Sequence, residues 1–299
     1  MEYLSGLASD LGSKRCEKLQ AVSYLNLSIS VVILLGILVS YLPQHHRIIS
    51  RGTSEGISPY FVLLGTTSST SAFANILVQP ASRADVACCK TVSAFECAAG
   101  LLGIAQVGVQ WFCFWVILLL FFIFFPREPT LPYVPESKQH TWKTAVFVAV
   151  VCVLHGLLVV VLSAVFIFAA PSRLGLWANI LGVMGAILAG TQYLPQIWMT
   201  YHLGHVGSLS IPTMLIQAPG SFLWAGSLAA RLGWEGWSTW SILLFTGMLQ
   251  VCLLVMGITF EIKARRAKLN GDGDTTSIVD GEATDRTPLL NGSREETRT

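Results

Sequence analysis

Charged residues are scarce in this sequence. Asp, Glu, Lys and Arg make up 12% of its 299 residues, and hydrophobic residues make up 53%. Soluble domains carry about 25% charged residues, so this chain has too few to cover a surface that faces water. None of the four charged types occurs from Thr144 to Ser172 or from Leu174 to Ala230. Because about 18 mostly apolar residues can cross a bilayer core as a helix, the sequence predicts an integral membrane protein.

The residue patterns of an enzyme are also missing. No Ser-His-Asp, His-Glu-x-x-His or paired-carboxylate arrangement occurs, so we expect no enzymatic activity, no cofactor and no metal. The formal net charge of +2 is small, and the basic residues are scattered apart from a cluster at 263–268. Nothing therefore points to nucleic acid, and the expected partners are a small-molecule substrate and the lipid bilayer.

The seven cysteines show no paired extracellular spacing. Cys113, Cys152 and Cys252 lie inside apolar runs, where cysteine behaves as a small hydrophobic residue. Cys88-Cys89 and Cys97 occupy a more polar stretch. One disulfide is possible there, but the spacing alone does not define it.

Apolar windows of about 20 residues predict seven membrane helices. The windows are 22–45, 58–78, 103–125, 142–169, 176–201, 210–230 and 237–261. The more polar stretch 80–102 is expected to be a loop, with or without an interfacial helix. Basic residues near the ends of the windows slightly favour a cytoplasmic C-terminus, and an odd number of spans then places the N-terminus in a lumen or outside the cell.

One tetrapeptide occurs twice. Tyr41-Leu42-Pro43-Gln44 recurs 152 residues later as Tyr193-Leu194-Pro195-Gln196, and a glycine and a serine in the following loop match at the same offset. The sequence thus predicts two repeats, 22–125 and 175–261, separated by a cytoplasmic loop and linker helix at 126–174. A lumenal segment (1–21) and a polar, disordered cytoplasmic tail (262–299) flank them. The expected fold is an all-α membrane protein in which two parallel three-helix bundles are joined by one helix (3+1+3).

The two Pro-Gln pairs predict hinges. Proline within a helix removes a backbone hydrogen bond and kinks the helix. In a membrane the freed carbonyl needs a partner, which an adjacent glutamine can supply. Pro43, Gln44, Pro195 and Gln196 are therefore the predicted gating residues of an alternating-access device. The alternative is that these prolines are ordinary ones, because proline is frequent in membrane helices.

Both Pro-Gln motifs, the Glu55-Gly-Ile-Ser58 loop and the 3+1+3 pattern resemble the PQ-loop repeat family. That family includes cystinosin, the lysosomal and vacuolar cationic amino-acid transporters and, more distantly, the SWEET sugar transporters. The resemblance covers about residues 22–261. It implies two three-helix bundles around a central substrate path, with the Pro-Gln helices bending to open either gate.

Polar side chains within the apolar windows are candidates for the lining of that path, because they are unfavourable in a bilayer unless they serve packing or function. The candidates are Asn75, Asn179, Gln192, Gln217, Trp224 and Gln250. Each polar group could instead form a hydrogen bond between helices, and Trp224 could face lipid.

Proton coupling has less support. PQ-loop transporters of acidic compartments often carry a membrane-embedded Asp near the second Pro-Gln motif, and this chain has no acidic residue from Thr144 to Ala230. The resemblance to a proton symporter is therefore incomplete. Glu96 and His155 are the predicted coupling residues, with His45 and His46 as further candidates, and facilitated diffusion stays open.

The tail carries one short motif. Asp285 lies four positions before Leu289-Leu290, as in acidic dileucine signals that adaptor proteins recognise on the way to a vacuole or lysosome. The predicted function is transport of a small polar solute, most favourably an amino acid, across such a membrane. A seven-helix receptor or nutrient-sensing scaffold and a SWEET-like sugar uniporter are the alternatives.

Overall fold

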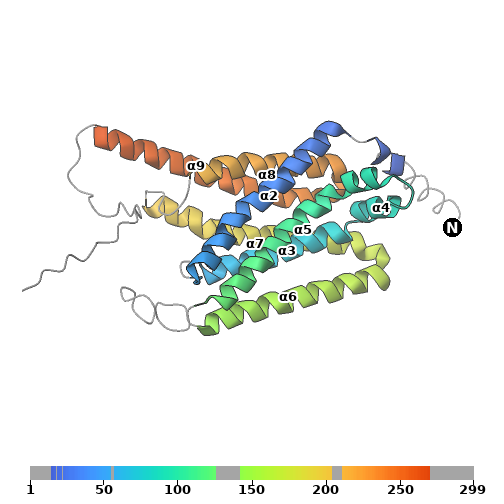
Figure 1. Cartoon of the computed structure of the whole chain (residues 1–299), viewed down its shortest axis with the longest axis horizontal. Coiled ribbons are helices and arrows are strands. Elements are labelled where there is room, and N and C mark those ends of the chain that lie inside the picture. Colours follow the sequence, from blue (N-terminus) through green and yellow to red (C-terminus); the bar gives the residue numbers. More distant parts are fainter. Residues whose placement is uncertain are drawn as a thin grey trace, which may run out of the picture.

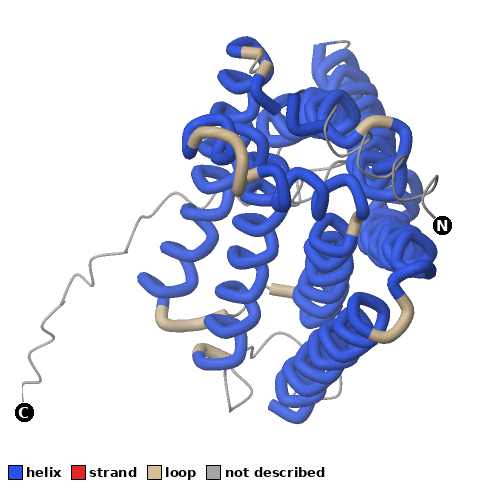
Figure 2. Tube along the Cα trace, turned by 90° about the vertical axis from the view of Figure 1, so that its right-hand side faces the viewer, coloured by secondary structure: helices blue, strands red, loops and turns tan. Residues whose placement is uncertain are grey.

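The structure, a computed structural model, describes residues 15–17, 19–21, 23–54, 57–125, 142–203 and 211–269. Within these ranges the regular structure is entirely helical (Figure 2). Besides two 3-10 helices (Pro171–Arg173 and Trp234–Gly236), the described residues form seven long α-helices and one short one. They are α2 (Tyr24–Arg51), α3 (Pro59–Val78), the short α4 (Pro80–Cys88), α5 (Ala94–Ile123), α6 (Trp142–Phe168), α7 (Leu174–Leu203), α8 (Ile211–Leu232) and α9 (Trp237–Leu269).

Among the described residues, six helices are long and apolar enough to cross a membrane. They are Tyr24–Arg51, Pro59–Val78, Ala94–Ile123, Trp142–Phe168, Pro171–Leu194 and Trp234–Lys263. These six coincide with six of the seven predicted windows. The remaining window, 210–230, corresponds to α8, which is less apolar because it contains Gln217, Pro219, Gly220 and Ser221. Large apolar side chains such as Leu154, Leu157 and Val161 of α6 are exposed, as expected of a surface that faces lipid.

The helices have two distinguishable ends. At one end, Arg231 near the end of α8 contacts Ala99 near the start of α5, and Gln79 after α3 contacts Glu235 before α9. This end carries the disulfide bonds, and we call it the disulfide end. At the other end, Ser54 after α2 contacts Phe121 and Phe124 near the end of α5, and we call it the Pro43 end. The start of α2 and the C-terminal end of α9 lie on opposite sides in Figure 1.

Corresponding helices of the two predicted repeats pack in the same order. In the first repeat α5 packs between α2 and α3, and in the second α9 packs between α7 and α8. Helix α6 packs mainly on α3 and lies away from α8 and α9 (Figure 1). The third helix of each repeat therefore fills the space between the first two.

Helix α3 is the centre of the molecule because its middle consists of small side chains. Residues 65–71 read Gly-Thr-Thr-Ser-Ser-Thr-Ser and all are buried. The hydroxyls of Thr67, Thr70 and Ser71 are satisfied by carbonyl oxygens one helical turn earlier, so they can be buried without other partners. Ser68 instead donates to the carbonyl oxygen of Gly185, at 2.9 Å. The small residues thus allow α3 and α7 to approach closely.

For the segment after α3, the structure has the predicted alternative that contains a helix. The segment forms the short helix α4, and α5 then begins at Ala94 rather than at the predicted Gly103. The early start has a local cause: the Ser93 side chain accepts from the Glu96 backbone N–H, and Glu96 accepts from the Ser93 N–H at 2.7 Å. This reciprocal capping box stabilises the first turn of α5.

Two disulfide bonds hold this region together. Cys16 is bonded to Cys88 at the end of α4, and Cys89 is bonded to Cys97 in the first turn of α5. The N-terminal segment, α4 and α5 are thereby linked covalently. The second bond lies within the stretch where the sequence allowed one, whereas the participation of Cys16 was not predicted.

Candidate functional site

A central cavity of about 350 Å³ lies among α2, α3, α5, α7, α8 and α9. Both repeats therefore contribute to it. Its polar lining consists of amides, hydroxyls and one indole: Ser40, Tyr41, Gln44, Ser68, Ser69, Gln110, Gln192, Tyr193, Gln217, Ser221, Trp224, Thr239, Thr246 and Gln250. None of the described lining residues carries a charge. A pocket of this size, with convergent polar groups on apolar walls, is typical of a small-molecule site.

The repeated tetrapeptide contributes a matched pair of tyrosines to this cavity. Tyr193 of α7 accepts a hydrogen bond of 2.9 Å from the side-chain amide of Gln250 on α9. Tyr41 of α2 lies close to the side chain of Gln110 on α5, and both side chains line the same cavity. In each repeat the tyrosine of the first helix thus pairs with a glutamine of the third. The two Tyr–Gln pairs were not predicted, although Gln250 was among the candidates.

The second pair extends to a third helix. Ser221 of α8 donates to the Gln250 side-chain oxygen at 2.9 Å. The Gln250 amide therefore connects α7, α8 and α9, the three helices of the second predicted repeat. The Gln250 side chain can exchange Ser221 or Tyr193 for a polar solute, because all three side chains line the same cavity.

The structure describes part of the predicted hinge. Pro43 lies inside α2 with its ring exposed, and Gln44 lines the central cavity. Pro195 and Gln196 fall within the range of α7, but their side chains lie outside the described residues. Pro219 is a further proline inside a helix, in α8, that the repeat did not indicate.

The predicted path residues divide into two groups. Gln192, Gln217 and Trp224 line the central cavity. Asn75 does not line it: this side chain is fully buried and donates to the Ala178 carbonyl oxygen and to Ser238, at 2.6 and 3.0 Å. Asn179 borders a separate groove that is formed by α7 alone.

The predicted coupling residues lie outside the described lining of the cavity. Glu96 is part of the capping box at the disulfide end. His155 of α6 lies 3.1 Å from the Ser71 hydroxyl on the side of α3 that faces α6, and His45 lies 3.2 Å from the Cys113 carbonyl oxygen. The predicted sorting residues Asp285, Leu289 and Leu290 lie outside the described residues.

Comparison with known proteins gives this architecture a family. The PQ loop repeat matches the chain twice, at residues 25–84 and 177–237. The two matches begin 152 residues apart, the same offset as that of the tetrapeptide. An uncharacterized protein of the fission yeast Schizosaccharomyces pombe is 33% identical over 254 residues, which is 80% of this chain and 82% of the relative. The chain belongs to the PQ-loop repeat family.

Proposed function

We propose that the protein is a transporter that moves a small, polar, uncharged or zwitterionic solute across a membrane by alternating access. The observation that carries the proposal is the central cavity, whose wall comes from both repeats and carries the two Tyr–Gln pairs. A solute in this cavity would contact both halves of the molecule. Movement of one half against the other could then expose the solute to either side.

The proposal includes α8 as a seventh membrane span, in the 3+1+3 arrangement. Helix α8 has 22 residues, enough to cross a bilayer core of about 30 Å. It packs along α9, and its polar Gln217 and Ser221 border the cavity. The lower hydropathy of α8 then reflects its position beside the path.

The lining also restricts the substrate. Five glutamines and several hydroxyls offer both donors and acceptors, and no described lining residue can neutralise a net charge. This supports a neutral amino acid, whose two charges balance, over a cationic one. A sugar or polyol is the second candidate, because hydroxyl groups match the same lining. The absence of a carboxylate or imidazole from the described lining favours facilitated diffusion over proton coupling.

The disulfide end supports a proposed orientation and compartment. Disulfide bonds persist in oxidising, extracytoplasmic compartments, so we place this end in a lumen or outside the cell and the Pro43 end in the cytosol. The dileucine motif Asp285–Leu290 would then lie on the cytosolic side, where adaptor proteins could read it. A vacuolar or lysosomal membrane is the location that this motif favours.

The test is uptake into proteoliposomes that contain the purified protein. Radiolabelled neutral, cationic and anionic amino acids and a set of hexoses are offered with and without an imposed pH gradient. We expect saturable uptake of a neutral solute that does not need the gradient. Uptake that occurs only with the gradient would reject facilitated diffusion. Glu96 and His155 would then again be the candidate proton-coupling residues.

A second measurement separates transport from sensing. Binding of each solute is measured on the same preparation from the shift of its melting temperature. A solute that binds but does not move would reject the transporter and support the nutrient-sensing scaffold. If no solute is bound and none is transported, the central cavity is not a site for amino acids or hexoses.

A further inference from the structure

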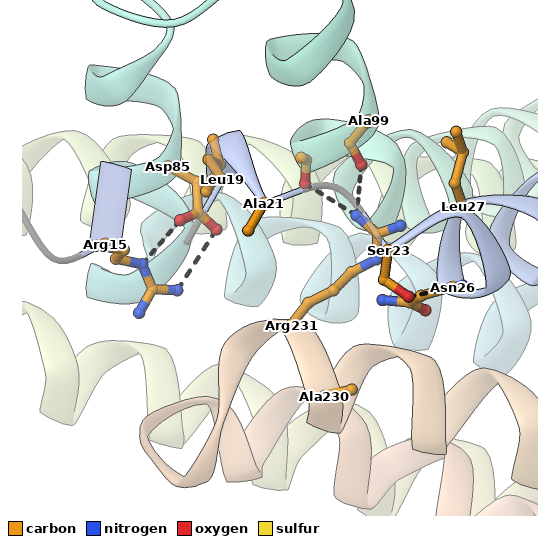
Figure 3. A pocket seen from close by; sticks show the side chains of 11 residues that line it. Arg15, Leu19, Ala21, Ser23, Asn26, Leu27, Asp85, Ala99, Ala230 and Arg231 are labelled. Carbon is orange, nitrogen blue, oxygen red and sulfur yellow. Dashed lines mark hydrogen bonds and ion pairs between the residues drawn. The ribbon is translucent and has the colours of Figure 1, made fainter. Parts of the chain in front are cut away.

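A second cavity, which we call the vestibule, opens at the disulfide end. It has a volume of about 310 Å³. The vestibule is lined by Arg15, Leu19, Ala21, Ser23, Asn26, Leu27, Asp85, Ala99, Gly100, Ala230 and Arg231 (Figure 3). One layer of side chains separates it from the central cavity. On α8, Trp224 and Leu228 line the central cavity, and Arg231, less than one helical turn beyond Leu228, lines the vestibule.

Arg231 is the largest polar group in this layer. Its guanidinium donates to the carbonyl oxygens of Ala99 and Gly100, the latter at 3.3 Å, and to the Ser30 hydroxyl at 2.8 Å. Figure 3 shows the side chain reaching from α8 towards Ala99 on α5. One side chain thus joins α8 to both α2 and α5.

Ser30 is the centre of the same layer on α2. Its side chain is completely buried, and its hydroxyl lies 3.1 Å from the Ser227 hydroxyl of α8. The Ser30 carbonyl oxygen accepts from Gln106 of α5 at 2.8 Å, and Ser227 donates to Asn26 at 3.0 Å. Five polar side chains from three helices therefore close the space between the two cavities.

The two contact regions between the repeats differ in extent. Helices α3 and α7 contact each other over much of their length, with buried bonds from Ser68 to Gly185 and from Asn75 to Ala178. The described hydrogen bonds between α2 and α8 instead lie in the single layer of Asn26, Ser30, Ser227 and Arg231. Movement of one repeat against the other therefore disturbs fewer contacts if α2 and α8 part than if α3 and α7 part.

The polar character of the layer makes such parting reversible. Hydroxyl, amide and guanidinium groups can exchange their protein partners for water, which the adjacent vestibule can supply. An apolar contact region would instead expose hydrophobic surface when it opened. Gly103 of α5 helps the layer to close, because a Cβ atom at this position would lie 2.8 Å from a Leu228 methyl group.

We propose that Arg231, with Ser30, Ser227, Asn26 and Gln106, forms the closed gate between the central cavity and the disulfide end. The structure then represents the state in which the path is shut at that end. Opening requires Arg231 to release Ser30 and the α5 carbonyls. The proposal rests on the transport function proposed above, but its first test needs no knowledge of the substrate.

The first test measures access to the central cavity with a thiol reagent. Gln110→Cys is introduced as a reporter in a background in which Cys113, Cys152 and Cys252 are replaced by alanine. A membrane-impermeant maleimide is applied from the disulfide end of oriented proteoliposomes. We expect Arg231→Gln to raise the labelling rate at least about tenfold, and Arg173→Gln, which removes an exposed cation at the same end, to leave it unchanged.

Equal labelling with and without Arg231 would overturn the gate even if the protein transports a solute. Failure of the protein without substitutions to transport any solute, together with increased labelling of the reporter variant, would instead reject the function and keep the gate. A melting curve shows whether the Arg231→Gln protein is folded.

The second test holds the layer closed and does not require removal of Arg231. Ser30→Cys and Ser227→Cys are combined, and a copper–phenanthroline oxidant is used to form a disulfide across the 3.1 Å contact. We expect the oxidant to reduce transport by the double variant at least about tenfold, whereas it leaves transport by each single variant at the level of the same variant without oxidant. A cross-linked protein that transports normally would overturn the gate, and so would failure of the two cysteines to react.

Discussion

The side-chain amide of Gln250 donates a hydrogen bond of 2.9 Å to the hydroxyl of Tyr193, and Gln110 pairs with Tyr41 in the other repeat. Both tyrosines belong to the duplicated tetrapeptide, and all four side chains line the central cavity. The duplication therefore preserves a pair of polar contacts as well as a proline. Because each pair joins the first helix of a repeat to the third, it can couple bending of the Pro-Gln helix to the solute.

The matched pairs predict matched effects. Tyr41→Phe and Tyr193→Phe each remove one hydroxyl and keep the ring. Since a polar contact such as the Tyr193–Gln250 hydrogen bond contributes roughly 0.5–1.5 kcal/mol, we expect each variant to lower uptake about two- to tenfold. Tyr24→Phe is the control because Tyr24 is exposed at the start of α2. Initial rates of uptake measure the effect, and a loss confined to one of the two variants would show that the pairs are not equivalent.

The hinge prediction concerns the prolines. Alanine at a position inside a helix restores the missing backbone bond and removes a penalty of about 3 kcal/mol. We expect Pro43→Ala combined with Pro195→Ala to lower uptake at least about tenfold while the melting temperature stays the same or rises. Pro80→Ala is the control, because Pro80 begins α4 and interrupts no helix there. Unchanged uptake in the double variant would reject the hinge, even for a working transporter.

Features governed by local chemistry were readable from the sequence. Apolar runs located the long helices, because the length of a membrane helix is set by the bilayer. The tetrapeptide located the two repeats and, through Gln44, part of the cavity wall. The capping box at Ser93 and Glu96 was also visible as a Ser-x-x-Glu pattern, which would have placed the start of α5 correctly.

Features that depend on contacts between distant residues were not readable. Cys16 meets Cys88 only because the N-terminal segment lies against α4, and Arg231 meets Ser30 across 201 residues. Polarity alone also could not separate Asn75, a buried link between helices, from Gln217, a cavity residue. A buried polar group has the same sequence signature whether its partner is a helix or a solute.

The two asparagines predicted for the path offer a test of that distinction. Asn75 donates to Ala178 and Ser238 and accepts from Thr239, so Asn75→Leu leaves several buried groups without partners. We expect a loss of stability of about 1–3 kcal/mol, measured as a lower melting temperature in detergent. Asn179→Leu is the matched control, since Asn179 borders a groove of α7 and should change stability little. Equal melting of the two variants would contradict the structural role of Asn75.

Close packing of α7 on α9 gives a further prediction. A Cβ atom at Gly182 would lie 2.5 Å from the Ser238 carbonyl oxygen, a backbone atom that cannot rotate away. Gly182→Ala must therefore separate the two helices, and we expect it to lower the melting temperature by several degrees. Gly226→Ala in α8 meets nothing within 4 Å and should keep or slightly raise stability. A stable Gly182→Ala protein would show that the two helices are less tightly packed than described.

The disulfide pattern predicts a count of reactive thiols that also tests the orientation. In protein denatured without reductant, Cys113, Cys152 and Cys252 should react with a mass-tagged maleimide, and all seven cysteines should react after reduction. Cys16→Ser should add one tag, because it frees Cys88 from its bond. Seven tags without reduction, on protein taken directly from cells, would mean that these cysteines face a reducing compartment. The disulfide end would then lie in the cytosol, and the proposed direction of the Arg231 gate would be reversed.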